Sequence, residues 1–265
     1  MKTIQNIFIS IICALTVNVS AQEKSFQFDI APGISNSHII ERLSNPMIFR
    51  GTGISPLIRI QRYGSRSRQF VNGKVAYANL KNGVDNYKAE NFRTSLNIGS
   101  EFAVLGQKDG SNQNYLMLGG SISSFYCKTC FFFKLPSIWA TALKTWYWRH
   151  SLDFTASGKI KLSDKQNIIF RMGVPVVCNI SRPTFSSSGD FDVQLNTREI
   201  KTFGNTVFIG ENFSIETSVA YYRPISQNLE LFAEYEFSFN SYKNPDKIAM
   251  YMNNLNIGIT FKLKK

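Results

Sequence analysis

Residues 229–239, LELFAEYEFSF, decide the fold of this chain. Every odd-numbered position in the stretch is apolar or aromatic, and four of the five even-numbered positions carry Glu or Ser. Because successive side chains of an extended strand point to opposite faces, this period of two predicts a β-strand with one apolar and one polar face. The carboxylates of Glu230, Glu234 and Glu236 then lie together on the polar face.

The same alternation recurs along the chain on both sides of this stretch. It is strong over residues 92–104, 146–156, 168–178, 213–222 and 255–263, and weaker over residues 26–30, 57–62, 75–80 and 115–126. No segment of helical length carries an apolar stripe with a period of 3.6 residues. The sequence therefore predicts an all-β chain of about ten strands.

The connections between the predicted strands alternate in length. Short polar turns are expected at residues 63–68, 108–110, 163–166 and 224–228. Long loops are expected at residues 31–50, 81–91, 131–144, 179–205 and 241–250. Outer-membrane barrels have this arrangement, with short periplasmic turns and longer external loops. The pattern predicts a transmembrane, antiparallel, up-and-down β-barrel with both chain ends in the periplasm.

Two other architectures compete with the ten-strand membrane barrel. Residues 191–195 also alternate, and one more hairpin there would make twelve strands. A soluble β-sandwich or lipocalin-like barrel would bury its apolar rows and expose its polar rows to water. The apolar rows here are bulky and nearly pure, and Glu recurs beside Ser, Asn and Gly on the polar face. Both features favour the membrane barrel.

The composition fits a membrane barrel better than a soluble domain. The chain has 22 Phe, 11 Tyr and 3 Trp with only 18% charged residues, which excludes disorder. Its mean hydropathy of −0.13 argues against a polytopic helical membrane protein. In a barrel, outward apolar rows and inward polar rows average to such a value, and aromatic residues gather at both lipid–water interfaces.

The N-terminus is typical of a secretory signal peptide. Lys2 precedes an apolar run over residues 7–17, and Val19 and Ala21 place small side chains before Gln22. The apolar run is too short for a membrane-spanning helix but has the length of a signal-peptide core. We expect cleavage after residue 21, so that residues 22–265 form a single barrel domain.

The cleavage region Val-Ser-Ala-Gln at residues 19–22, the Tyr- and Phe-rich strands and the C-terminal NIGITFKLKK at residues 256–265 resemble small outer-membrane β-barrel proteins of Bacteroidetes-type bacteria. The resemblance implies an outer-membrane location and insertion by the outer-membrane assembly machinery, which recognises a terminal strand. The tail departs from the usual insertion signal, because lysines follow Phe261 and Leu263 where a terminal aromatic residue is expected. The resemblance implies no catalytic residues.

If the apolar rows face lipid, the alternate residues line the barrel lumen. The charged residues of these rows form a predicted lumen network: Arg93, Glu101, Arg149, Asp153, Arg171, Glu216, Glu230, Glu234 and Glu236. A ten-strand barrel is only slightly wider than one that its own side chains fill, so opposite charges can pair across it. This predicts a structural or interaction barrel with a largely plugged lumen. A narrow passage for ions or small solutes, lined by the same charges, is the alternative.

An outer-membrane lipid hydrolase, such as a phospholipase or deacylase, is a second alternative. It needs a Ser activated by a His that a third group orients. His38 falls in a predicted loop, and His150 falls on the lipid side of its strand, whereas the adjacent Ser151 points to the opposite face. We therefore predict no enzyme activity and no catalytic residues.

Neither a metal site nor a cofactor is predicted. Cys127 and Cys130 have CxxC spacing, but no second CxxC or His pair completes a four-ligand zinc site. In an oxidising compartment, a local disulfide between these two cysteines is the expected use of the motif. The carboxylates of residues 230–236 could also serve as acids or calcium ligands, a minor alternative to charge pairing.

The chain carries 30 Lys and Arg against 18 Asp and Glu, a net charge of +12. Nucleic-acid binding would need a basic face with stacking aromatics on a soluble module, which export argues against. Lys and Arg at strand ends are instead expected to meet lipopolysaccharide phosphates, although scattered solubilising lysines would look the same. The expected partners are outer-membrane lipids, lipopolysaccharide and the assembly machinery, and the expected state is a monomer.

Overall fold

The computed structural model describes residues 25–42, 45–83, 87–106, 114–135, 138–163, 166–183, 203–244 and 246–264. The predicted signal peptide lies outside these residues. The described elements are strands: β1 (Ser25–Ala31), β2 (Gly33–Glu41), β3 (Asn45–Ile54), β4 (Leu57–Tyr63), β5 (Ser67–Asn82), β6 (Lys88–Leu105), β7 (Tyr115–Leu135), β8 (Ile138–Ser163), β9 (Gln166–Ser181), β10 (Asn205–Phe208), β11 (Asn212–Pro224), β12 (Leu229–Tyr242) and β13 (Ile248–Lys264). Within the described ranges, no helix is long and apolar enough to cross a membrane.

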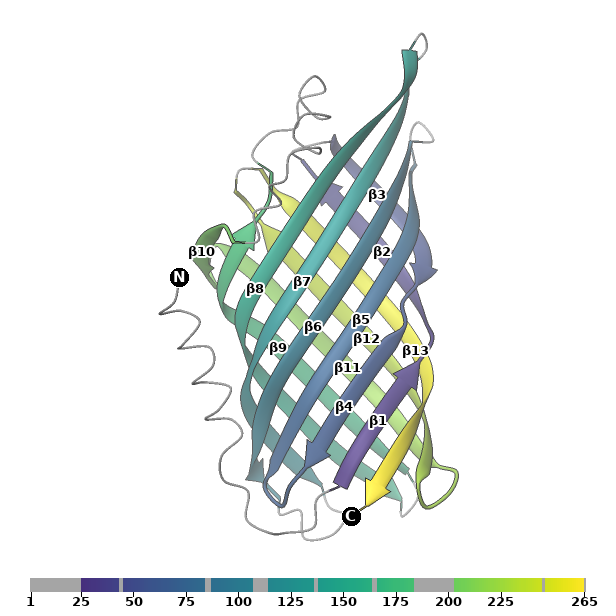
Figure 1. Cartoon of the computed structure of the whole chain (residues 1–265), viewed down its shortest axis with the longest axis vertical. Coiled ribbons are helices and arrows are strands. Elements are labelled where there is room, and N and C mark those ends of the chain that lie inside the picture. Colours follow the sequence, from purple (N-terminus) through teal and green to yellow (C-terminus); the bar gives the residue numbers. More distant parts are fainter. Residues whose placement is uncertain are drawn as a thin grey trace.

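The strands close into a tilted, antiparallel barrel (Figure 1). β1 and β2 act as one barrel strand, because both pair with β13 on either side of Pro32. β3 and β4 are joined in the same way across Pro56, since both pair with β5. A proline cannot donate a ladder hydrogen bond, which accounts for both interruptions. The closed barrel thus has ten strands, as predicted, and the short β10 adds one pairing to β9.

β1 begins and β13 ends at the lower end of the barrel in Figure 1, and the β7–β8 hairpin reaches farthest at the opposite end. We call these the terminal end and the hairpin end. The predicted long loops at residues 31–50 and 131–144 are wrong, because strands β2, β3, β7 and β8 occupy most of both stretches. In β2 the outward Asn36 is as polar as the buried Ser35 and Ser37. A strand with two polar faces shows no alternation, although its backbone still pairs.

The two faces of the barrel wall have inverted polarity relative to a soluble barrel. Leu231 and Tyr235 face outward and are 43% and 51% exposed, whereas Glu230, Glu234 and Glu236 of the same strand are buried inside. Other strands also carry outward rows that are rich in exposed Ile, Leu, Val and Phe. An apolar exterior around a polar interior suits a barrel surrounded by lipid. This excludes the soluble sandwich or lipocalin-like alternative.

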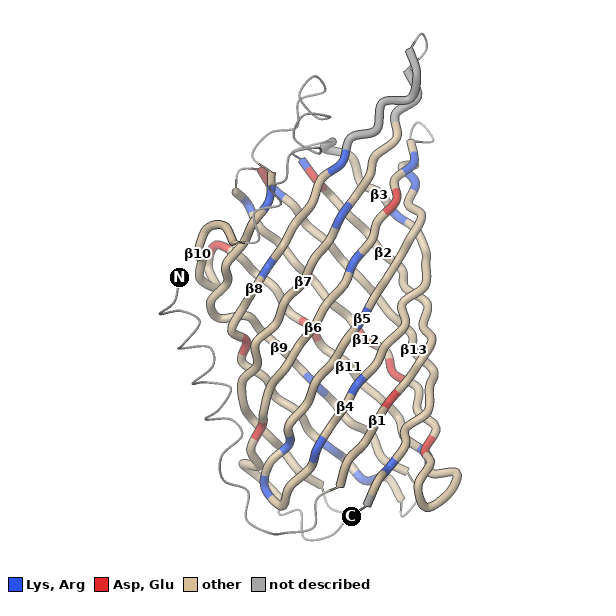
Figure 2. Tube along the Cα trace, in the orientation of Figure 1, with Lys and Arg blue, Asp and Glu red and all other residues tan. Residues whose placement is uncertain are grey.

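The lumen has two differently filled halves. Near the hairpin end, the inward side chains form an apolar plug: Ile39, Phe49, Ala78, Leu80, Ala89, Phe125, Cys127, Phe131, Tyr147, Cys178, Ile180, Val207, Tyr242, Ile248, Met250 and Met252. Toward the terminal end, charged side chains predominate, with a smaller apolar cluster around Leu57, Tyr222 and Phe232. Figure 2 shows the Lys, Arg, Asp and Glu positions spread along the barrel.

Candidate functional site

The centre of the charged half is a buried cluster of four ionised side chains. Arg59 on β4 donates to both carboxylate oxygens of Glu234 on β12 at 2.9 Å and to Asp29 on β1 at 3.2 Å. Arg171 on β9 lies 3.6 Å from Glu234 and donates to the Tyr222 hydroxyl at 2.9 Å. Glu234 thus joins two guanidinium groups from different parts of the barrel wall.

A second pair lies beside this cluster. The Arg68 guanidinium lies 3.2 Å from the Glu101 carboxylate, and both side chains are about 2% exposed. Arg68 and Glu101 are directly opposite in the β5–β6 register, and Ser157 of β8 also donates to Glu101. The Arg68 guanidinium also lies over the Phe70 ring, 4.7 Å from its centroid. The pair is therefore packed against the wall as well as ion-paired.

Lys74 spans the lumen. From β5 its ammonium donates to Glu236 on β12 at 2.5 Å and lies 3.9 Å from Glu216 on β11. In the order of strands around the barrel, β11 is half-way round from β5. Arg149 of β8 lies 3.9 Å from the other oxygen of Glu216, and Asn254 donates to Glu236 at 3.2 Å. A chain of charges therefore crosses the full width of the interior.

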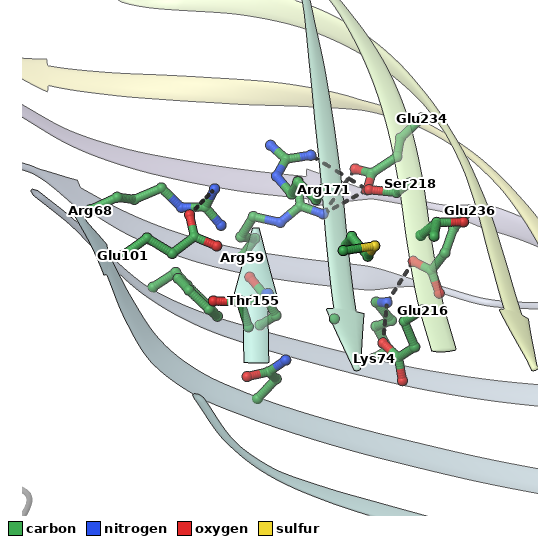
Figure 3. A pocket seen from close by; sticks show the side chains of 16 residues that line it. Arg59, Arg68, Lys74, Glu101, Thr155, Arg171, Glu216, Ser218, Glu234 and Glu236 are labelled. Carbon is green, nitrogen blue, oxygen red and sulfur yellow. Dashed lines mark hydrogen bonds and ion pairs between the residues drawn. The ribbon is translucent and has the colours of Figure 1, made fainter. Parts of the chain in front are cut away.

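Between these groups lies a cavity of about 60 Å³. Figure 3 shows its charged side chains converging from several strands. Four cations and four carboxylates line it: Arg59, Arg68, Lys74, Arg171, Glu101, Glu216, Glu234 and Glu236. The opposite charges balance, so the lining favours neither anions nor cations.

The apolar plug lies in the lumen above the charged half. The Phe49 and Phe131 rings meet edge to face with centroids 4.9 Å apart, and Phe125 meets Tyr147 in the same way at 6.1 Å. Arg93 marks the boundary between the halves and donates to Ser35 and Ser37 at 2.9 and 2.7 Å.

At the hairpin end, beyond the plug, Arg182 donates at 2.5 Å to Glu41 and to the Asp246 carbonyl. This pair reaches from the end of β9 to the end of β2, which are not neighbouring strands. It therefore ties two sides of the barrel mouth together.

The predicted network residues all lie on the inner side of the wall, but they do not all pair. Glu101, Arg149, Arg171, Glu216, Glu230, Glu234 and Glu236 have ion-pair partners, that of Glu230 being Lys262. Arg93 is held by hydroxyls instead. One oxygen of the buried Asp153 has no hydrogen-bond partner in the described part of the chain.

Six ion-paired residues of the described chain were not predicted from the sequence: Asp29, Glu41, Arg59, Arg68, Lys74 and Arg182. Five of these residues lie in weakly alternating predicted strands or in predicted turns and loops, and Lys74 lies just before the predicted strand of residues 75–80. Arg59 could have been found, because it alternates with the exposed Ile58 and Ile60 of β4. Glu41 and Arg182 carried no such signal, since neither lies in a strand that alternation revealed.

The expected disulfide is not formed, and the three described cysteines are free thiols. The predicted strand ends at residue 126, but β7 continues through both Cys127 and Cys130. Residues three apart in a strand point to opposite faces, so Cys127 is buried in the lumen and Cys130 is half-exposed outside. Their sulfur atoms cannot meet without breaking the strand.

Both histidines lie on the outer wall. The His150 ring lies 5.4 Å from the Trp148 ring and 5.1 Å from the Phe203 ring, on the outer face as predicted. Ser151 points into the lumen and shares a 2.7 Å hydrogen bond with Ser123. His38 lies in β2, not in a loop, opposite Arg50. Among the described residues, no group of three His, Cys, Asp or Glu side chains could hold a metal ion.

The closed barrel with an apolar exterior and a charged interior defines the class of this protein: its fold is that of bacterial outer-membrane β-barrels. No protein-family model matches the sequence, and no curated protein matches it either. The outer-membrane protease OmpT of Escherichia coli has a similar structure, with 8% identity over 94% of this chain and 99% of that chain and a TM-score of 0.53.

Two further solved structures are similar over most of their length. The translocator domain of the autotransporter NalP from Neisseria meningitidis matches with 10% identity over 98% of this chain and 96% of that chain, at a TM-score of 0.48. The attachment invasion locus protein Ail of Yersinia pestis matches with 10% identity over 92% of this chain and 100% of that chain, at a TM-score of 0.36. At these identities, the OmpT likeness shows the fold and nothing about activity.

Proposed function

We propose that this protein is a structural or interaction barrel of the outer membrane whose lumen is closed. The observation that carries the proposal is the bridge from Lys74 to Glu216 and Glu236, which crosses the barrel at its full width. A solute on the barrel axis would have to displace this bridge. It would then meet the apolar plug, which offers an ion no replacement for its hydration shell.

The two layers resist opening for different physical reasons. Breaking a buried pair by moving one partner away leaves a charge without compensation in a medium of low dielectric constant. Parting the plug exposes apolar surface and forfeits close packing. The narrow passage for ions or small solutes is the competing function, and the central cavity is the feature that supports it.

We further propose that the barrel is not an enzyme. A hydrolase needs a nucleophile within hydrogen-bond reach of a base. His150 lies on the outer face and Ser151 in the lumen, on opposite sides of the wall. The buried carboxylates of Glu101, Glu234 and Glu236 are each ion-paired with Arg or Lys.

The location proposed for the barrel is the bacterial outer membrane. The apolar outer wall supports it, together with the signal peptide expected at residues 1–21 and the terminal strand expected to be read by the assembly machinery. A Bacteroidetes-type origin and a monomeric state stay predictions of the sequence. Membrane fractionation of cells that express the full chain tests the location.

Conductance in planar lipid bilayers tests the closed lumen. We expect the refolded wild-type protein to insert without stepwise conductance, because both layers block the axis. A variant that combines Lys74→Ser with Phe131→Ala should conduct. It serves as the positive control, because its conductance shows that the assay detects protein that has inserted into the bilayer. Regular conductance steps from the wild-type protein would overturn the proposal in favour of the channel.

A further inference from the structure

The outer wall carries two neighbouring rows of polar side chains near the hairpin end, which we call the interface patch. The residues of each row are directly opposite one another on consecutive strands. The lower row is Asn253, Asn36, Thr52, Asn79 and Glu90, and the upper row is His38, Arg50, Lys81 and Lys88. All of these side chains point away from the lumen and are exposed or partly exposed.

The row immediately below the patch is apolar and aromatic. It consists of Leu255, Ile34, Ile54, Tyr77 and Phe92, again opposite one another, and they are between 36% and 64% exposed. An apolar row that gives way to polar rows, with Tyr at the change, marks the edge of the hydrocarbon layer on a membrane barrel. The interface patch therefore lies at the level of lipid head groups on the hairpin side.

The upper row contains three positive charges that lie opposite one another. Arg50 is opposite Lys81, and Lys81 is opposite Lys88, on three adjacent strands. Directly opposed like charges destabilise a sheet, because their Cβ atoms are only about 5 Å apart. Within the part of the chain that the structure describes, none of the three has an ion-pair partner. Glu90 adds a single negative charge, so the patch as a whole carries a net positive charge.

The lower row supplies uncharged hydrogen-bonding groups beside these cations. The Tyr77 hydroxyl donates to the amide oxygen of Asn79 at 3.3 Å, which leaves the Asn79 amide nitrogen to donate outward. Asn36 and Thr52 lie next to it in the same row. The patch therefore offers cations and neutral polar groups above an apolar wall.

We propose that the interface patch binds a phosphorylated glycolipid of the outer leaflet. Arg50, Lys81 and Lys88 bind its phosphate groups by charge-assisted hydrogen bonds, which also relieves their mutual repulsion. Asn36, Thr52 and Asn79 bind sugar hydroxyls. The acyl chains lie along the apolar row below. The inference rests on the proposed outer-membrane location and assigns a lipid class and a site to it.

The terminal end of the wall provides a matched control. Arg62 and Arg223 also face outward there, but Arg62 is opposite Phe26 and Gln69, and Arg223 is opposite Leu231. Neither arginine opposes another cation. A double variant Arg62→Ser/Arg223→Ser thus removes as much charge as Lys81→Ser/Lys88→Ser without touching the patch.

The test measures binding of purified lipopolysaccharide to the refolded full chain in detergent micelles by native mass spectrometry. Parallel arms use dephosphorylated lipopolysaccharide, phosphatidylglycerol and inorganic phosphate as competitor. We expect the Lys81→Ser/Lys88→Ser variant to lose at least about tenfold in affinity, since it removes two of the three cations that bind the phosphates. The control variant should stay within about twofold of wild type.

Three outcomes would overturn the inference. Dephosphorylated lipopolysaccharide could bind equally well, phosphatidylglycerol or inorganic phosphate could compete fully, or the control variant could lose as much affinity as the patch variant. Unchanged heat-modifiable migration of both variants on gels shows that they fold, and the single variant Lys88→Gln serves if the double variant does not. A conducting wild-type barrel would refute the closed lumen and leave this result standing.

Discussion

The two halves of the lumen are filled by different kinds of side chain. In the terminal half, Arg59, Lys74 and Arg171 reach carboxylates on strands that are not their neighbours. In the hairpin half, rings such as Phe49 and Phe131 fill the space by volume. A charged layer depends on every partner being present, because a single deletion leaves a buried charge uncompensated. An apolar layer depends on the sum of its contacts, so it tolerates small changes better.

The largest expected effect comes from removing the carboxylate that joins two guanidinium groups. Breaking a buried ion pair costs about 3–5 kcal/mol. Glu234→Leu should lower the free energy of unfolding by about 5 kcal/mol, the upper end of this range, because Arg59 and Arg171 both lose their shared partner. Urea titration of the protein in lipid vesicles, followed by tryptophan fluorescence, measures it. The control Glu90→Gln, on the outer wall, should change stability by less than about 0.5 kcal/mol. Equal losses in the two variants would show that the cluster contributes no special stability.

The next largest effect is expected in the plug. Phe131→Ala should cost about 3 kcal/mol, because it removes a fully buried ring and leaves a cavity against Phe49. Phe132→Ala, one residue further along the same strand and facing outward, should cost clearly less. The same urea titration compares them. Similar values for the two variants would mean that the plug is not tightly packed.

A double-mutant cycle sharpens the comparison between the two layers. The single variants Lys74→Ser and Phe131→Ala should each show no conductance in the bilayer, because the other layer still blocks the axis. Only the combined variant should conduct, with a preference for cations, since Glu216 and Glu236 then lack Lys74. Conductance from either single variant would assign the closure to one layer alone.

The smallest effect concerns the cysteines. A reductant should leave the unfolding midpoint unchanged, because the thiols of Cys127 and Cys130 are free. A membrane-impermeant maleimide should label Cys130 on the outside of β7 and leave Cys127 unlabelled until the barrel is unfolded. Mass spectrometry of the labelled peptides reads this out. Labelling of both cysteines in the folded barrel would contradict the inward placement of Cys127.

Much of the barrel wall could be read from local sequence. The alternation of residues 229–239 and its repeats predicted the strands, their even number and the side that faces lipid, because a strand sorts its side chains by position alone. The strands β2 and β3 were not predicted from the sequence. Their alternation is lost where two apolar residues are adjacent, as at Ile39 and Ile40, or where both faces are polar. The plug was hidden because its residues follow no single pattern: Phe131 is followed by Phe132, whereas Leu80 and Ala89 lie between polar residues.

What the sequence by itself determined is the kind of wall: antiparallel strands with an apolar outside and a charged inside. Only the tertiary structure decided how that interior is filled. Lys74 and Glu236 are 162 positions apart, and their 2.5 Å contact depends on the tilt and stagger with which ten strands close. The opposed cations Arg50, Lys81 and Lys88 are likewise separate in sequence and meet only through strand register. Local pattern sets the face of each side chain, whereas closure of the barrel sets its partner.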